Sequence, residues 1–284
     1  MADLLHILTR GDDPSLQLAR RLGGEVVPAE QPLRLWRALR AERERIIVWG
    51  DVAMRQVLRL GVRDPRAVVQ VAPPTGSRVV ADVGRLVCFT RRALENSIRR
   101  GCPTRRAVVA LPVPPDAAPA AAGDVRRVLV PRHVTHDSGH RPLVLAATIL
   151  TLAGWPLRLV GGRRGPLRPT VATLAHQLGG PATWRPDDPT PPASFATAAE
   201  HLAHPIDHAA ALAAGLPCVT VAGAYHDALA ALAAPAEVSP TAKGRDLART
   251  LRRVRESADL RAELAERGRA FIAEQRDFAA AVLS

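Results

Sequence analysis

The sequence predicts two successive α/β domains, each built on a parallel β-sheet with helices on both faces. Short, continuously apolar runs alternate with amphipathic segments along most of the 284 residues. Such runs are typical of strands that are buried on both faces. The alternation stops at residues 116–124, a segment rich in Ala and Pro, and then starts again. We therefore predict domains at 1–115 and 125–265, joined by a linker at 116–124.

The first domain contains apolar runs that we interpret as strands, separated by segments with helical periodicity. The strands are expected at 4–8, 25–28, 46–49, 67–72, 85–89 and 107–112, and the helices at 15–22, 33–43, 52–60 and 90–100. Helix ends carry their usual signals. Thr90 is suited to cap the fourth helix, and Gly101 follows its last turn. Strict alternation of strand and helix favours parallel pairing throughout.

The second domain repeats this alternation. Strands are expected at 128–130, 157–160, 182–184, 200–203 and 218–221, and helices at 140–152, 170–178, 193–199, 208–214, 226–232, 246–255 and 260–275. Its most informative stretch is 204–223. Asp207 is placed to cap an Ala-rich helix, Gly215 and Pro217 end that helix, and residues 218–221 form a β-branched strand. The amides at the first turn of such a helix favour an anion, which makes this helix a candidate phosphate site.

Composition narrows the choice of partner. The net charge is +12, but aromatic residues make up only 3% and Arg is spread along the chain. A nucleic-acid partner is therefore not expected, whereas loose attraction to anionic lipid fits this charge. The longest apolar run, 143–155, is too short to span a membrane, and the first residues lack the features of a signal peptide. We expect a cytoplasmic protein, with peripheral contact at the inner membrane face as a further option.

Two sets of residues are of the types that bind metal ions. The three cysteines, Cys88, Cys102 and Cys218, are widely separated and lie mostly in apolar strand patterns, which is typical of buried structural residues. Two His triplets, 133/136/140 and 201/204/208, share one spacing. Each triplet runs through a predicted strand, turn and helix, so its members would not share a helix face. No metal site is expected.

Five segments, in order, resemble the group 1 family of retaining nucleotide-sugar glycosyltransferases, which have the GT-B fold of two facing Rossmann-like domains. These segments are DVGRLVCFTRRALENSIRRGCPTRRAVVALPVPPD at 82–116, RRVLVPRHVTHDSGHRPLVLAATIL at 126–150, PLRLVGG at 156–162, ALAAGLPCVTVAG at 211–223 and DLRAELAERGRAFIAEQRDFAAAV at 259–282. The resemblance implies that the first domain holds the acceptor and the second the nucleoside-diphosphate sugar. It also implies that residues 266–284 form a helix crossing back to the first domain.

The resemblance further implies a metal-independent transfer, in which basic side chains and helix N-termini neutralise the departing diphosphate. The donor is a substrate, so no cofactor is expected, and the acceptor is unknown, with lipid-linked and anionic molecules both open. The expected donor-site residues are Arg132, Ser138, Gly139, Gly161, Gly162, Trp184, Arg185, Asp207, His208, Ala209 and Ala210. Arg132 and Asp207 are the candidate catalytic residues. Each candidate also has a simpler interpretation, because Asp207 can be only a helix cap and Trp184 only a core residue.

Several family positions carry different residues here. The family's Lys falls on Ser138, and the Glu that binds the nucleotide ribose falls on Ala210. Asp207 or Glu200 is a candidate for a displaced carboxylate, and Arg141, Arg163 or Arg164 for a displaced cation. These departures keep a second hypothesis open, in which the chain is a non-catalytic homologue that acts as a binding or scaffold subunit. A third hypothesis is a regulator that binds a nucleotide or phosphate without a sugar.

Overall fold

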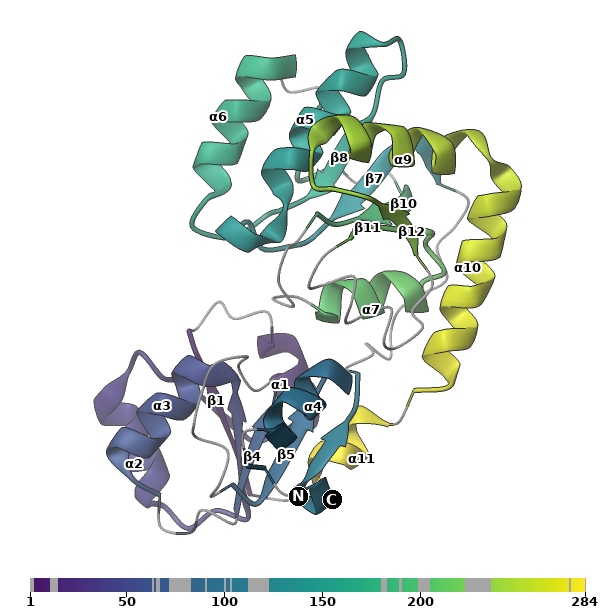
Figure 1. The fold of residues 1–284 in the computed structure, drawn as a ribbon. Helices are drawn as coiled ribbons and strands as arrows, with labels where there is room; N and C mark the ends of the chain where they lie inside the picture. The colour runs from purple at the N-terminus through teal and green to yellow at the C-terminus, as the bar shows by residue number, and fades with distance from the viewer. Residues whose placement is uncertain are drawn as a thin grey trace. The chain divides into compact units, whose positions relative to one another are not determined.

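The chain divides into two compact units. A computed structural model describes residues 3–10, 15–62, 64, 67–71, 83–89, 91–99, 101–102, 104–111, 123–179, 183–188, 191–198, 205–222, 236–275 and 277–283. Unit 1 comprises Met1–Pro112 and Gln275–Ser284, and unit 2 comprises Val113–Glu274. Each unit contains one six-stranded parallel sheet (Figure 1). The predicted fold class, with two Rossmann-like α/β domains, is confirmed.

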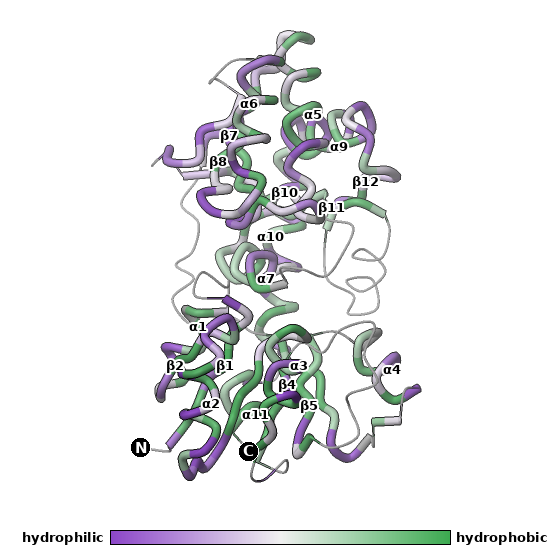
Figure 2. The backbone as a smooth tube through the Cα atoms, turned by 90° about the vertical axis from the view of Figure 1, so that its left-hand side faces the viewer, coloured by the Kyte–Doolittle hydropathy of each residue, from purple (hydrophilic) through white to green (hydrophobic). Residues whose placement is uncertain are grey.

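The sheet of unit 1 has the strand order β2-β1-β3-β4-β5-β6. Its strands are β1 (Leu4–Leu8), β2 (Glu25–Pro28), β3 (Arg45–Trp49), β4 (Val68–Val71), β5 (Arg85–Cys88) and β6 (Ala107–Val109). The described helices are α1 (Leu16–Leu22), α2 (Pro32–Arg40), α3 (Gly50–Leu60), α4 (Arg91–Arg99) and α11 (Phe278–Leu283), with a 3-10 turn at Thr104–Arg106. Figure 2 shows hydrophobic residues along the strands and hydrophilic residues at the periphery.

The two faces of this sheet are covered by different groups. On one face, Leu5 and Val48 belong to a core that includes Leu35 of α2 and Met54 of α3. The other face includes an aromatic cluster. The ring of Phe278 in α11 lies 6.0 Å from Trp49 and 6.1 Å from Phe89, measured between ring centroids. The last helix of the chain therefore packs on the sheet of unit 1.

The sheet of unit 2 has the strand order β12-β11-β10-β7-β8-β9. Its strands are β7 (Asp124–Val130), β8 (Arg158–Gly161), β9 (Trp184–Arg185), β10 (Pro192–Ala196), β11 (Cys218–Val221) and β12 (Glu237–Ser239). The described helices are α5 (His140–Leu152), α6 (Arg168–Gly179), α7 (Pro205–Ala213), α9 (Gly244–Glu256) and α10 (Ala258–Ala273), with a 3-10 turn at His136–Ser138. Helices α6, α5 and α9 pack side by side as one layer, while α10 packs on α7 (Figure 1).

The direction of winding reverses between β7 and β10. From β7 the chain proceeds to β8 and β9 on one side, and then returns to β10 on the other side of β7. In open α/β sheets, the crevice at the carboxyl ends of the strands beside such a reversal is where ligands bind. Residues that follow β7, β8 and β10 are therefore positioned for a site.

One predicted helix is a strand. The Ala-containing segment 193–199 was expected to be helical, but residues 192–196 form β10 in the middle of the sheet. Phe195 pairs with Leu129 of β7 and with Cys218 of β11. Burial between two strands outweighs the helix propensity of the alanines. The expected strand at 200–203 and the expected helix at 226–232 lie outside the described residues.

Candidate functional site

Basic residues follow three adjacent strands of unit 2 at their carboxyl ends. Arg132 comes two residues after β7, Arg163 and Arg164 follow β8, and Arg185 ends β9. All four side chains are exposed. Since β7, β8 and β9 are neighbours in a parallel sheet, these guanidinium groups share one edge. This edge carries the positive charge that an anionic ligand requires.

The loops after β7 and β8 are held together by main-chain hydrogen bonds. The amide of Arg164 donates to the carbonyl oxygen of Arg132 at 3.2 Å, and the amide of Val134 donates to the carbonyl oxygen of Arg164 at 2.7 Å. Gly165 has φ +117°, and a Cβ atom there would lie 2.4 Å from the carbonyl oxygen of Val134. Only glycine permits this approach. The two loops thus form one ordered element that carries the basic edge.

Asp207 connects this edge to α7. It lies in the first turn of α7, and its Oδ2 atom accepts a hydrogen bond from the main-chain amide of Arg132 at 2.7 Å. The Oδ1 atom is 3.6 Å from Nε of Arg132. The Asp207 side chain is nearly buried, whereas that of Arg132 is 60% exposed. Asp207 therefore fixes the backbone of the β7 loop and leaves the guanidinium group accessible to a ligand.

Ser138 is fully buried and does not face solvent. Its Oγ atom accepts from the amide of Thr135 at 2.9 Å and lies 2.7 Å from Nδ1 of His140. Nε2 of His140 lies 3.0 Å from the carbonyl oxygen of Pro131. The Ser138 hydroxyl donates to the carbonyl oxygen of Thr135 at 2.9 Å, and the direction of its contact with Nδ1 is set by the imidazole tautomer. The structure therefore places Ser138 in the support of the β7 loop, not at the surface where a phosphate would bind.

Gly139 lies between Ser138 and the first turn of α5. Its φ is +72°, and a Cβ atom would lie 2.2 Å from the main-chain carbon of Ala198. The residue must therefore be glycine for the segment after β10 to pass so close. The first amides of α5 have no partner within the helix and, with the positive end of the helix dipole, favour an anion. Pro142, in the same turn, has no amide.

Gly161, Gly162 and Trp184 pack together at the end of β8. The indole Nε1 of Trp184 donates to the carbonyl oxygen of Gly161 at 2.9 Å. A Cβ atom on Gly162 would lie 2.9 Å from both Nε2 of His140 and the Trp184 ring. Trp184 is buried, with its ring edge-on to His140. These contacts make Trp184 a packing residue with its indole nitrogen satisfied. Beside it, a hollow of about 440 Å³ is lined by Arg168, Pro169, Ala172, Ala175, His176, Trp184 and Pro186.

The remaining predicted residues of α7 are internal. His208 is buried, its ring lies edge-on at 5.5 Å from that of Phe195, and burial lowers its pKa to about 4. It is therefore neutral at pH 7 and adds no charge to the edge. Ala209 is buried and Ala210 is half-buried.

The structure thus brings the predicted residues into two linked groups. Arg132 and Asp207 are joined directly. Ser138, Gly162 and Trp184 lie against His140, Gly139 precedes it, and Gly161 is bound to Trp184. The sequence singles out His140 only as a member of a His triplet. Two signals in the sequence could have pointed to His140. It stands at the start of a predicted helix, and the Gly161-Gly162 pair at the end of a predicted strand allows close packing there. Glu200 lies outside the described residues. Among the residues that the structure describes, no group of three or more His, Cys, Asp or Glu is placed to hold a metal ion.

No protein-family model and no curated protein sequence matches the chain. Solved structures do. Anabaena Alr3699/HepE in complex with UDP-glucose has a TM-score of 0.68 at 11% identity, over 99% of this chain and 97% of that one. S. aureus MnaA with UDP has a TM-score of 0.65 at 12% identity, over 98% and 94%. WaaG, a glycosyltransferase involved in lipopolysaccharide biosynthesis, has a TM-score of 0.61 at 14% identity, over 96% and 95%. The two six-stranded parallel sheets with their helices match these structures, and the chain has the GT-B fold.

Proposed function

We propose that the protein is a nucleotide-sugar glycosyltransferase and that the carboxyl edge of the unit 2 sheet binds the donor diphosphate. The observation that carries the proposal is the bond between Asp207 and the Arg132 amide, because it holds an exposed guanidinium group at the sheet reversal. Two similar structures, Alr3699/HepE and MnaA, contain UDP or UDP-glucose. In this proposal unit 1 binds the acceptor, as the resemblance of the sequence to the group 1 family implies.

The proposed chemistry depends on charge that develops on the leaving group. The bond between the anomeric carbon and the terminal phosphate oxygen breaks, and the diphosphate leaves with the electron pair. The acceptor oxygen then bonds to the same face of that carbon, and its proton passes to the departing phosphate. Arg132, Arg163 and the first-turn amides of α5 and α7 would stabilise the diphosphate more strongly as its charge grows. No metal ion is needed in this scheme.

One observation favours the second candidate function, a non-catalytic subunit that binds the nucleotide. Position 210 is Ala, and the nearby carboxylate of Asp207 is already engaged by Arg132. Neither residue therefore offers the ribose contact that the resemblance assigns to a Glu. The two candidates share the diphosphate site and differ in turnover, so they are separated by measuring binding and sugar release independently.

Binding is tested by thermal unfolding with UDP, GDP and ADP and their glucose conjugates. A ligand at one hundred times its Kd stabilises the folded state by about 2.7 kcal/mol, so a matching nucleotide is expected to raise Tm by several degrees. Arg132→Ala should reduce this rise, while its main-chain bond to Asp207 is kept. Arg158→Ala is the matched control, because Arg158 is exposed at the opposite, amino end of β8.

The result that would refute the donor site is an unchanged Tm with every nucleotide. Equal responses of Arg132→Ala and the wild-type protein would refute the residue assignment alone. Release of UDP or another nucleoside diphosphate from the stabilising sugar nucleotide would then support the transferase. Stabilisation without release, across a panel of lipid-linked and soluble acceptors, would instead favour the binding subunit.

A further inference from the structure

The outer surface of α5 carries a stripe of exposed aliphatic side chains. Leu145, Ile149 and Leu152 are separated by four and three residues, so they lie on one face of the helix. Their exposed fractions are 40%, 41% and 82%. The opposite face of α5 is buried, with Leu143, Val144 and Ala147 in the main core of unit 2. An aliphatic stripe of this kind is costly to leave in water unless another apolar phase covers it.

Helix α9 carries a stripe of arginines beside the aliphatic one. Arg245, Arg249 and Arg252 have the same spacing of four and three, and all three are exposed. The two helices are packed in register. A Cβ atom on Gly244 would lie 2.9 Å from Cβ of Leu145, and the Arg252 guanidinium lies 4.7 Å from the ring of Trp155, which follows α5. We call the six stripe residues, together with Trp155, the amphipathic face.

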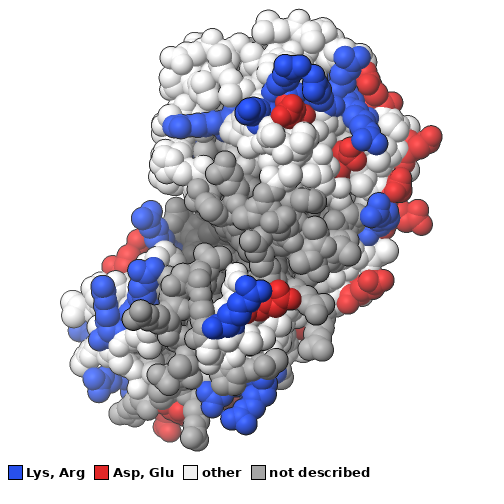
Figure 3. All heavy atoms as spheres, in the orientation of Figure 1, with Lys and Arg blue, Asp and Glu red and all other residues white. Residues whose placement is uncertain are grey.

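Charge on this side of unit 2 is strongly one-sided. Helices α5, α6 and α9 together contain seven Arg and two acidic residues, whereas α7 and α10 contain three Arg and four acidic residues. Figure 3 shows Lys and Arg side chains gathered over α9. Two copies of the chain that met through this face would bring like charges together, which opposes self-association. A partner that fits this face is therefore both anionic and apolar.

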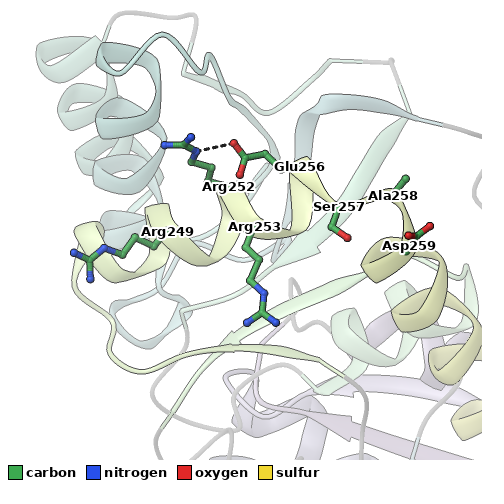
Figure 4. Close-up of a pocket in the computed structure, with 7 residues that line it drawn as sticks. All are labelled: Arg249, Arg252, Arg253, Glu256, Ser257, Ala258 and Asp259. Atoms are coloured by element: carbon green, nitrogen blue, oxygen red, sulfur yellow. Dashed lines mark hydrogen bonds and ion pairs between the residues drawn. The ribbon is translucent and has the colours of Figure 1, made fainter.

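The hollow at the junction of α9 and α10 is not a binding site for an anionic partner. It measures about 570 Å³ and is lined by Arg249, Arg252, Arg253, Glu256, Ser257, Ala258 and Asp259 (Figure 4). Arg252 pairs with Glu256 at 2.8 Å, and Arg253 pairs with Glu237 at 2.9 Å. Its lining thus carries both signs. By contrast, the Arg249 side chain is 67% exposed, and its ion pair with Asp246 is long, with 4.0 Å between Nη1 and Oδ1.

We propose that the amphipathic face docks the protein on an anionic lipid bilayer. Leu152, at the tip of the aliphatic stripe, enters the boundary between headgroups and acyl chains, and Trp155 lies at headgroup level. Arg245 and Arg249 contact the lipid phosphates. Aliphatic side chains along a helix, with a Trp and cations beside them, are the combination that interfacial helices use. None of the described helices is long and apolar enough to cross a membrane, and a docking surface needs no such helix.

The test is co-sedimentation of the full-length protein with vesicles of phosphatidylcholine, alone or mixed with phosphatidylglycerol. We expect binding only to the mixed vesicles, weakened but not abolished by high salt because the aliphatic contact persists. One arginine near an anionic surface contributes about a fivefold factor in partitioning, so Arg245→Glu with Arg249→Glu should lower it about twentyfold or more. Leu152→Ser should lower it about tenfold.

Matched controls use the other surfaces of the chain. Arg267→Glu on α10 makes the same kind of charge change at a 59% exposed side chain, and Leu33→Ser on α2 removes a leucine that is 75% exposed. Both should bind vesicles as the wild-type protein does. Circular dichroism and thermal unfolding check that every variant is folded, and since the altered side chains are exposed, no loss of fold is expected.

Three outcomes would overturn the proposal. The first is no binding of the wild-type protein to the mixed vesicles. The second is equal binding by the face variants, or a loss of binding caused by the control variants instead. The third is a different occupant, shown by a dimer that Leu152→Ser dissociates in light scattering, or by capture on immobilised poly-glutamate without vesicle binding. The test does not depend on nucleotide binding, so it stands whether or not the proposed transferase activity is found.

Discussion

Each unit buries a histidine that makes the same pair of contacts, but the two histidines lie in different parts of their sheets. In unit 1, Nε2 of His6 lies 2.8 Å from the carbonyl oxygen of Gly23, and Nδ1 accepts from the indole of Trp49 at 3.2 Å. In unit 2, Nε2 of His140 faces the carbonyl oxygen of Pro131, and Nδ1 faces the hydroxyl of Ser138. Both rings are satisfied on both nitrogens.

The difference is what each histidine holds in place. His6 lies within β1 and links it to β3, so it stabilises the interior of a sheet. His140 begins α5 at the carboxyl edge, against Gly162 and Trp184, so it stabilises the loop that bears Arg132. The same hydrogen-bonding arrangement thus supports a core in one unit and a candidate site in the other. In unit 2, the buried His140 lies at the carboxyl edge of the sheet beside Gly139 and Gly162, both with positive φ. Unit 2 is the unit that we expect to bind the nucleotide.

Gly139→Ala should have the largest effect on stability among the variants that test this difference. A Cβ atom would meet the backbone of Ala198 at 2.2 Å, and the left-handed φ adds strain. We expect a loss of about 4 kcal/mol in the free energy of unfolding, measured by urea denaturation.

Gly154→Ala is the matched control, because Gly154 has φ +79° at the end of α5 but nothing within 4 Å of its Cβ position. It should cost only about 1 kcal/mol. Similar losses for the two variants would mean that the edge of unit 2 tolerates change as well as an ordinary helix end does.

Acid should destabilise the protein through buried histidines that remain neutral in the folded state. Burial lowers the pKa of His208 from 6.5 to about 4, and burial also lowers that of His6, partly offset by the Gly23 carbonyl. Because the folded pKa lies below the unfolded one, stability is present above pH 6.5 and is lost as the pH falls toward 4. For His208 the loss is on the order of 3 kcal/mol by pH 4.

The measurement is the unfolding free energy against pH, compared with His208→Gln and His6→Gln. The informative quantity is the slope between pH 6.5 and 4, not the absolute stability, since either substitution also changes packing. His208→Gln should flatten the slope more than any exposed-histidine variant, such as His176→Gln. An unchanged slope would show that His208 is protonated in the folded state.

The fold was predictable because most strands are apolar on both faces. Continuous apolar runs such as 4–8 and 218–221 predict interior strands of a parallel sheet. β10 was missed because its residues, PASFA at 192–196, include no β-branched side chain, and only pairing with β7 and β11 makes the segment a strand. Local propensity does not include contacts with residues that are distant in sequence.

The site residues named from the sequence remain predictions, and the network of contacts that joins them was not predictable from residue types. Arg132 and Asp207 were identified separately, and the hydrogen bond that joins them uses a main-chain amide, which no residue type reveals. Ser138 was expected to face a phosphate, whereas its buried hydroxyl contacts the Thr135 carbonyl oxygen and His140. A sequence motif places residues along the chain, while burial decides which of them face the ligand.

Asp207→Ala tests the bond between the β7 loop and α7. Removing the carboxylate leaves the Arg132 amide without its partner, so we expect a loss of about 2 kcal/mol in unfolding free energy. Arg132→Ala keeps that amide and removes only an exposed side chain, so it should cost less than about 0.5 kcal/mol. Equal costs would show that the side-chain ion pair, rather than the main-chain bond, holds the loop.

An effect smaller than that of Asp207→Ala should come from removing the partner of Nδ1 in each histidine pair. Ser138→Ala deprives both His140 and the Thr135 amide of a contact, and we expect a loss of about 1 kcal/mol with faster hydrogen exchange in the β7 loop. Trp49→Phe deprives His6 in the same way, and its faster exchange should be confined to unit 1. If nucleotides stabilise the protein, only Ser138→Ala should weaken that stabilisation, because only His140 supports the loop of Arg132. A weaker response in Trp49→Phe as well would mean that the two histidines are not separate supports.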